Sequence, residues 1–216
     1  RWLSVAGQVA ACVSVAWILE WSFPVLPCFA LIATSVGLNL YLASRYSGSF
    51  RLSSTAALAV LAFDILQPTG LLMLTGGIQN PFSVFLIVPA LIASATQPPL
   101  TVAIITGFAV AATTLLATVH MPLPWSEPGG VSLPAGYVGG LWFAIVATLV
   151  FAAVYIYRVA AESRALADAL AATELVLQRE QHLSALDGLA AAAAHELGTP
   201  LSTIALVAKE MHRSVP

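Results

Sequence analysis

Charged residues are scarce in this chain of 216 residues, because Asp, Glu, Lys and Arg together make up only 8% of it. Soluble domains carry about 25% charged residues, so the composition excludes an ordinary soluble enzyme or binding domain. Hydrophobic residues make up 59%, and the mean hydropathy is +0.91. We therefore expect an all-α integral membrane protein, with no room for a large soluble catalytic domain.

Cysteine is also scarce. Cys12 and Cys28 are the two cysteines of the chain; both lie in hydrophobic runs and form no C-x-x-C motif. This arrangement favours two small packing residues over a disulfide or a metal pair. The chain begins at Arg1 without an initiator methionine, as is typical of a fragment, and its first hydrophobic run has no A-x-A-like cleavage site. We expect this run to be a retained helix.

Six hydrophobic runs approach the ~20 residues that a helix needs to cross a bilayer. They are Trp2–Leu19, Phe23–Ala43, Ser54–Leu74, Phe82–Thr96, Leu100–Val119 and Tyr137–Tyr157. If the N-terminus is cytoplasmic, six crossings place the loop from Arg45 to Arg51 and everything after Arg158 in the cytoplasm, as the positive-inside rule requires. The sequence therefore predicts a six-helix transmembrane domain over residues 1–158.

After Arg158 the chain is rich in Ala, Leu and Glu, with no glycine before Gly188 and no proline before Pro200. We expect the sixth span to continue as one long helix in the cytoplasm. We divide this helix into a signalling helix, residues 159–182, and a coiled-coil or dimerisation helix, residues 183–216.

The dimerisation helix carries a hydrophobic seam at spacings of three and four residues, as a coiled coil or helical bundle requires. The seam consists of Leu183, Leu186, Ala190, Ala193, Leu197, Ile204, Val207 and Met211, with Pro200 on the same face. Hydrophobic residues before Leu177 follow a different phase, so the register changes between Leu177 and Leu183. Either this change stores two packing states, or an Ala-rich helix tolerates both registers without consequence.

His195 lies two residues from seam positions on either side, so at ~100° per residue it points away from the seam and toward solvent. A neutral imidazole is a nucleophile, and Glu196 beside it can orient the ring or accept its proton. Thr199 and Pro200 follow, and proline breaks the helical hydrogen-bond ladder and bends the helix. The pattern predicts a phosphoacceptor histidine that another protein can reach.

The sequence His195-Glu-Leu-Gly-Thr-Pro-Leu resembles the H-box of sensor histidine kinases. Most such kinases carry Arg or Lys at the position of Gly198. The form with glycine resembles the H-box of the RegB/PrrB redox-sensing subfamily. Gly76-Gly77-Ile78-Gln79-Asn80-Pro81-Phe82 is similar to that subfamily's G-G-x-x-N-P-F segment, and Arg1–Gln8 and Phe63–Gln67 fit it too. The resemblance covers essentially the whole chain. It implies that His195 is the autophosphorylation site and that the segment from Gly76 to Phe82 contacts ubiquinone.

The resemblance also implies a homodimer in the bacterial inner membrane that passes phosphate to a cytoplasmic response regulator and responds to the quinone pool. The family's second dimerisation helix, its ATP-binding domain with Mg-ATP, and its redox-active cytoplasmic cysteine have no counterpart in these residues. We therefore expect this chain alone to be inactive as a kinase. We expect no metal site and no nucleic-acid partner.

The quinone assignment is chemically reasonable. Gly76 and Gly77 allow a planar ring to approach the backbone, the amides of Gln79 and Asn80 can bond to quinone carbonyls, and Phe82 offers a ring for stacking. Pro81 completes the motif. The alternative is a tight turn, with glycines for positive φ and an Asn-Pro pair that initiates the turn.

Asp64 is the ionisable residue deepest within a hydrophobic run. A charged, unpaired carboxylate in lipid costs several kcal/mol, so such a residue is a functional candidate. With Gln67 one turn away, it is either a proton acceptor coupled to quinone reduction or a hydrogen-bonding strut between helices, and we favour the strut. No Lys or Arg lies within any span, so we expect Asp64 to be protonated rather than paired.

Other classes of function are also open. One is a small transporter or channel, because Asn80-Pro81-Phe82 is superficially similar to the Asn-Pro-Ala turns of water channels, although the chain has no internal repeat. Another is a non-catalytic membrane scaffold with a cytoplasmic coiled coil. His120, beside Met121, suggests a metal or pH-sensing role, but no second ligand is spaced to join it, and an interfacial loop histidine is the better interpretation.

Overall fold

The computed structural model describes residues 1–45, 53–124 and 133–213, so Arg51 of the predicted cytoplasmic loop lies outside the described residues. Within these ranges all regular secondary structure is helical, which confirms the all-α class. The elements in chain order are α1 (Trp2–Val13), the π-helix η1 (Ser14–Ile18), α2 (Val25–Arg45), α3 (Ser54–Leu74), the 3₁₀-helices η2 (Gly77–Gln79) and η3 (Pro81–Leu86), α4 (Ile87–Thr96), α5 (Pro99–Thr118) and α6 (Ala135–Arg213).

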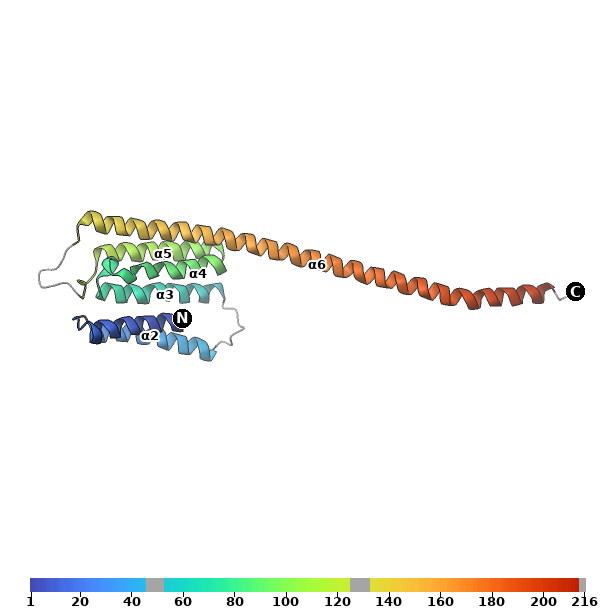
Figure 1. Ribbon diagram of the computed structural model, residues 1–216, viewed down its shortest axis with the longest axis horizontal. Helices are drawn as coiled ribbons and strands as arrows, with labels where there is room; N and C mark the ends of the chain where they lie inside the picture. Colours follow the sequence, from blue (N-terminus) through green and yellow to red (C-terminus); the bar gives the residue numbers. More distant parts are fainter. Residues whose placement is uncertain (46–52, 125–132, 214–216) are drawn as a thin grey trace. The chain divides into compact units, whose positions relative to one another are not determined.

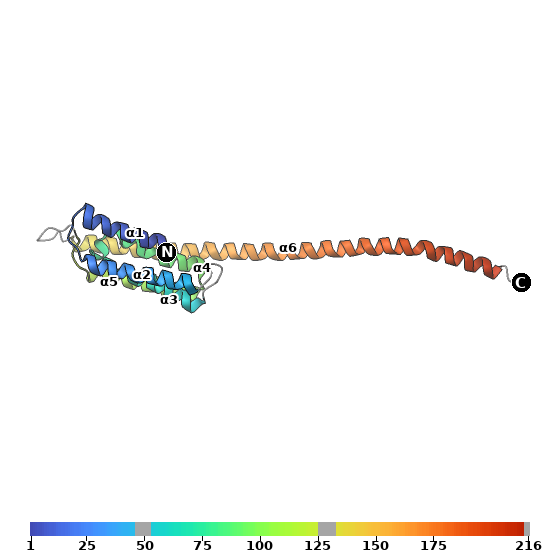
Figure 2. The same cartoon turned by 90° about the horizontal axis from the view of Figure 1, so that it is seen from below.

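The chain forms two compact units, Arg1–Ala160 and Ala161–Pro216. In the first unit, α3, α4 and α5 pack side by side, and α1 pairs with α2 (Figures 1 and 2). The second unit is the remainder of α6. The predicted division between a signalling helix at 159–182 and a dimerisation helix at 183–216 is not tested by this separation and stays a prediction.

Two hydrophobic clusters hold the first unit together. The larger joins α3, α4, α5, the two 3₁₀-helices and the first part of α6, and its fully buried members include Ile65, Ile105 and Leu149. The smaller lies between α1, α2 and α3 around Cys28, which is fully buried, with Cys12 packed against it. Both cysteines are free thiols.

In the described parts of the chain, four helices are long and apolar enough to cross a membrane, so the predicted six spans are not confirmed as such. They are Val25–Arg45, Ser54–Leu74, Pro99–Thr118 and the apolar part of Ala135–Lys209. The other two predicted spans form the shorter apolar segments Trp2–Ile18 and Pro81–Thr96. In the second of these segments, which holds the fourth predicted span, the first six residues form 3₁₀-helix, and the α-helix that follows has ten residues. At ~2.0 Å per 3₁₀ residue and ~1.5 Å per α residue, the segment is roughly 27 Å long.

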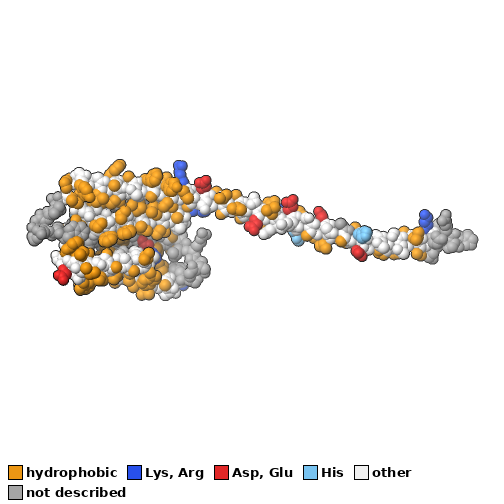
Figure 3. Space-filling model, in the orientation of Figure 1, with side chains coloured by type: hydrophobic (Ala, Val, Ile, Leu, Met, Phe, Trp, Pro, Cys, Tyr) orange, Lys and Arg blue, Asp and Glu red, His pale blue; other side chains and the backbone are white. Residues whose placement is uncertain are grey.

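The outer surface of the first unit is apolar, as lipid contact requires. Hydrophobic side chains cover the visible face of this unit, whereas acidic and histidine side chains gather on the second unit (Figure 3). Several buried hydroxyls of the first unit donate to the backbone of their own helices. Ser94 donates to the Ala90 carbonyl at 2.8 Å and Thr113 to the Ala109 carbonyl at 2.8 Å, so neither hydroxyl is left unpaired in an apolar interior.

Candidate functional sites

Gly76 and Gly77 form the turn that follows α3. Both adopt left-handed backbone conformations, with φ of +113° and +60°. A Cβ on Gly76 would collide with the Leu123 side chain, and a Cβ on Gly77 would lie 2.5 Å from the Leu116 carbonyl oxygen and 2.5 Å from Cγ of His120. The space beside both glycines is therefore filled by the end of α5 and the loop that follows it, and the turn interpretation accounts for both residues.

The loop after α5 is fixed to the end of α3. The Met121 amide donates to the Met73 carbonyl at 2.7 Å, and Nδ1 of His120 lies 2.9 Å from the Met121 carbonyl oxygen. The His120 ring thus packs over Gly77. Among the described residues no group of three or more His, Cys, Asp or Glu side chains is placed to hold a metal ion. The contact of the His120 ring with Gly77 gives this histidine a packing role in the turn.

The side chain of Asn80 links the start of η3 to Thr75, the residue that caps the C-terminus of α3. Its Oδ1 accepts a bond from the Phe82 amide at 2.9 Å, which caps η3, and its Nδ2 donates to the Thr75 carbonyl at 2.9 Å and to the Thr75 hydroxyl at 3.0 Å. Only 7% of Asn80 is exposed. Its amide is engaged in building the turn, and Pro81 begins η3 directly after it, where a missing N–H costs nothing.

Phe82, Phe85 and Gln79 are the side chains of this region that stay available to a ligand. Phe82 and Phe85 are 48% and 59% exposed, and their rings are nearly parallel, with centroids 6.1 Å apart and an interplanar angle of 14°. Gln79 is half-buried, and its amide has no hydrogen-bond partner among the described residues. The exposed surface of the motif is therefore an aromatic pair next to a free amide.

Asp64 has a basic partner, which corrects the prediction that it is unpaired. Its Oδ2 lies 2.9 Å from Nη1 of Arg1, and Nε of the same guanidinium donates to Oδ1 of Asn39 at 2.7 Å. Arg1 directly precedes the first hydrophobic run, Trp2–Leu19, so it does not count among the residues within the predicted spans. Helix α1 is shorter than α3, so its first residue reaches a carboxylate ten residues, ~15 Å, along α3.

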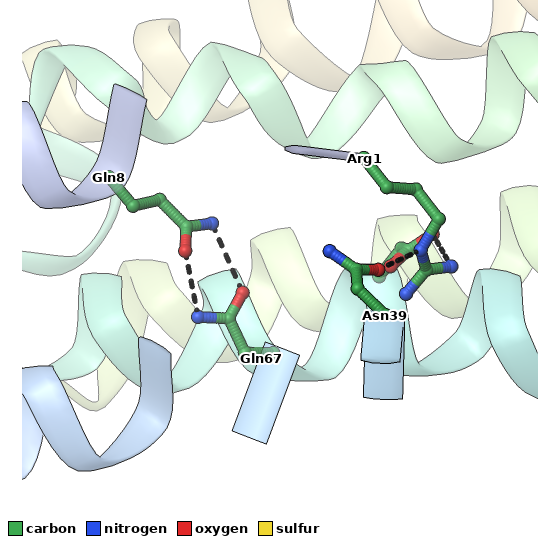
Figure 4. Close-up of polar contacts among 5 residues, drawn as sticks. Arg1, Gln8, Asn39 and Gln67 are labelled. Atoms are coloured by element: carbon green, nitrogen blue, oxygen red, sulfur yellow. Dashed lines mark hydrogen bonds and ion pairs between the residues drawn. The ribbon is translucent and has the colours of Figure 1, made fainter. Parts of the chain in front are cut away.

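Gln67 makes a second polar link between α1 and α3. Its Nε2 donates to Oε1 of Gln8 at 3.0 Å, and Nε2 of Gln8 donates back to Oε1 of Gln67 at 3.1 Å (Figure 4). Nε2 of Gln67 also lies 3.5 Å from the Leu31 carbonyl of α2. Together with the contacts of Asp64, these bonds tie α1, α2 and α3 to one another, as the strut interpretation expects.

His195, Glu196, Thr199 and Pro200 lie on α6 in the second unit, and their side chains are exposed. Pro200 does not end the helix, which continues to Arg213. Because proline has no N–H, the ladder loses the bond that residue 200 would donate to the Glu196 carbonyl. The hydroxyls of two nearby threonines bond to other carbonyls of the helix. That of Thr199 donates to the His195 carbonyl at 3.5 Å, and that of Thr203 to the Thr199 carbonyl at 3.1 Å.

The predicted seam has no partner among the described residues. Every described side chain from Glu162 to Lys209 is exposed, including Leu183, Leu186 and Leu197 of the seam. A single helix has nothing against which to bury such a stripe. The orientation of His195 relative to a packed seam therefore stays a prediction.

Comparison with known proteins gives one clear similarity. The chain is 41% identical over 211 residues to two curated sequences from Cereibacter sphaeroides, each named sensor histidine kinase RegB. The match covers 98% of this chain and 46% of each relative, so the chain spans about half the length of the curated relatives it matches. No family model matches the chain, and no solved structure does.

Proposed function

We propose that this RegB-like chain is the membrane sensor and first dimerisation helix of a two-component sensor histidine kinase. The observation that carries the proposal is the 41% identity to sensor histidine kinase RegB over 98% of the chain. The matched region includes both the hydrophobic bundle and the helix that carries His195. The rest of such a kinase would supply the Mg-ATP site, and this chain would supply the histidine and its control.

His195 would be the phosphoacceptor. Its exposed imidazole would attack the γ-phosphorus of ATP held by a kinase domain, the bond to the β-phosphate oxygen would break, and ADP would leave. Glu196 would orient the ring or take its proton. The phosphoryl group would then pass to an aspartate of a cytoplasmic response regulator, which restores the free histidine.

The test of this role is autophosphorylation of the full-length protein with γ-labelled ATP. We expect His195→Gln to abolish acid-labile labelling. His182→Gln is the matched control, because His182 is an exposed histidine of the same helix, and we expect it to be labelled like the wild type. Labelling that survives in His195→Gln would refute the assignment.

Both short apolar segments would cross the membrane, to give six crossings with both termini in the cytoplasm of a bacterial cell. Pro81–Thr96, at roughly 27 Å, is close to the ~30 Å hydrocarbon core, and small mismatches are absorbed by local thinning of the bilayer. The homodimer would form where the exposed hydrophobic seam of α6 meets that of a second copy, since burial of such a stripe drives coiled-coil association.

The sensory ligand would be ubiquinone of the membrane quinone pool, bound at the segment from Gly76 to Phe82. Gln79 would donate to a quinone carbonyl, and the pair of Phe82 and Phe85 would stack on the ring. Asn80 would act indirectly, because its amide holds the turn together.

The binding test compares aromatic side chains inside and outside this segment. We expect Phe82→Ala to weaken ubiquinone binding by the chain in lipid nanodiscs. Phe143→Ala removes an exposed ring of α6 and should leave binding unchanged. Equal binding by both variants and the wild type would place the ligand elsewhere.

Binding would reach His195 through the packing of the bundle against α6, which is one helix from Ala135 to Arg213. Moving a two-state equilibrium from almost entirely one form to the other requires ~5 kcal/mol of differential affinity. A single quinone headgroup is a weak source of so much energy. We therefore expect partial tuning of kinase activity rather than an on-off switch.

A further inference from the structure

A cavity of ≈ 330 Å³ lies between α5 and the first part of α6, within the first unit. Its walls are mainly apolar, with Val102 on α5 and Val150 and Val154 on α6. The lining residues are separate from the turn at Gly76 to Phe82 and from the polar contacts of Asp64, so the cavity belongs to neither candidate site.

The cavity has one charged end and one apolar end. Its lining runs from Pro99 to Thr106 along α5 and from Arg158 back to Val150 along α6, ~10–12 Å at 1.5 Å per residue. The two helices are antiparallel here, as the bond from Trp142 on α6 to the Thr114 hydroxyl on α5 also requires. Pro99 and Arg158 therefore share one end of the cavity, and Thr106 and Val150 share the other.

The helices around the cavity are loosely packed. Helix α6 comes less close to its neighbours than α3, α4 and α5 come to one another. At the far end Trp142 joins α6 to α5 through its 3.0 Å bond to Thr114, whereas a gap remains between the two helices along the cavity. An apolar void forfeits dispersion contacts with the atoms that line it, so an alkyl chain of suitable size gains contacts there.

Three polar groups on the cavity wall have no partner among the described residues. The hydroxyl of Thr106 is buried and makes no hydrogen bond, and the Tyr157 hydroxyl and the Arg158 guanidinium make no hydrogen bond or ion pair either. Arg158 is the first basic residue after the hydrophobic run of α6. An arginine at such a position reaches the level of the lipid headgroups while its stem lies along the apolar surface.

We propose that this cavity binds one anionic phospholipid. An acyl chain fills the apolar part along Val102, Val150 and Val154, and the phosphate pairs with Arg158 and accepts a bond from Tyr157. Basic pockets between transmembrane helices are suited to such headgroups. A quinone fits the set less well, because its headgroup has no negative charge to pair with the arginine.

The test is lipid retention by the 216-residue chain, measured by native mass spectrometry after release from nanodiscs that hold equal amounts of phosphatidylglycerol and phosphatidylcholine. We expect one phosphatidylglycerol per chain to be retained in preference. Arg158→Gln should reduce that preference about fivefold, which corresponds to ~1 kcal/mol for one arginine at the membrane surface. Arg45→Gln is the matched control, because it removes the basic residue that ends α2, and it should change nothing.

Two cavity variants complete the test. Ala103 lines the cavity and is exposed, so Ala103→Phe fills the space without crowding a buried position, and we expect it to abolish retention of either lipid. Thr106→Val keeps the shape of the side chain and removes the hydroxyl at the end of the cavity away from Arg158. It should leave the preference for phosphatidylglycerol unchanged, because the phosphate binds at the other end.

Three results would overturn the proposal. One is an equal loss of the preference for phosphatidylglycerol in Arg158→Gln and Arg45→Gln. That result would show only a general attraction of anionic lipid to basic residues at the membrane surface. Another is unchanged retention in Ala103→Phe when its helical circular dichroism matches the wild type. The third is displacement of the bound lipid by ubiquinone in both the wild type and Arg158→Gln, which would make the cavity a quinone site.

Discussion

Replacement of Asn80 by alanine separates a structural role of the G-G-x-x-N-P-F segment from direct contact with a ligand. Asn80→Ala removes the cap on the Phe82 amide and the two bonds to Thr75. A typical hydrogen bond contributes about 0.5–1.5 kcal/mol net, so the three together predict a loss of ~2–3 kcal/mol in the free energy of unfolding. This loss should occur with no quinone present.

Gln79→Ala is the matched control for this loss. It removes a neighbouring amide that has no hydrogen-bond partner among the described residues, so its effect on unfolding should stay within about 0.5 kcal/mol, as for surface substitutions. Unfolding would be followed in detergent by SDS titration with far-ultraviolet circular dichroism. If Asn80→Ala unfolds at the same SDS fraction as the wild type, its amide does not hold the turn, and the structural role assigned to Asn80 is wrong.

Two further substitutions test the packing of the bundle. Gly77→Ala forces a Cβ to within 2.5 Å of the Leu116 carbonyl oxygen, at a positive φ that alone costs about 1–2 kcal/mol. It should therefore destabilise the first unit strongly in the same titration. Gly140→Ala is the control, because the new Cβ has open space around it, and it should not destabilise the unit. Arg1→Gln and Asp64→Asn should each lower the free energy of unfolding of the unit. The double variant should lose less than the sum of the two single losses, because either substitution alone already breaks the pair. Additive losses would show that the two side chains do not interact.

Hydropathy predicted the bounds of individual helices well where a hydrophobic run forms one regular α-helix. The run Ser54–Leu74 coincides with α3, and Leu100–Val119 differs from α5 by a single residue at each end. At Phe82–Thr96 hydropathy indicated an apolar helical run but not its helix type, which run length does not reveal. The Asn80 cap and the proline after it start a 3₁₀-helix, and the α-helix begins only at Ile87.

The contacts between helices could not be predicted from the sequence. Hydropathy places Asp64 deep in its own helix but does not give the offset between neighbouring helices, and that offset brings Arg1 to it. In the same way, a tight turn was the alternative interpretation of the two glycines, and no sequence pattern indicates that Leu123 and His120 from the next loop cover them. Gln67 was singled out by its polarity, and its partner Gln8 lies on another helix.

The most direct test of the proposed quinone control is the rate of His195 phosphorylation in the full-length protein, reconstituted in nanodiscs with either oxidised or reduced ubiquinone. We expect acid-labile phosphate on His195, at rates that differ between the two redox states in the wild type and become equal in Phe82→Ala. Equal rates in the wild type, or a redox response that Phe82→Ala retains in full, would contradict control of the kinase by a quinone bound at this segment.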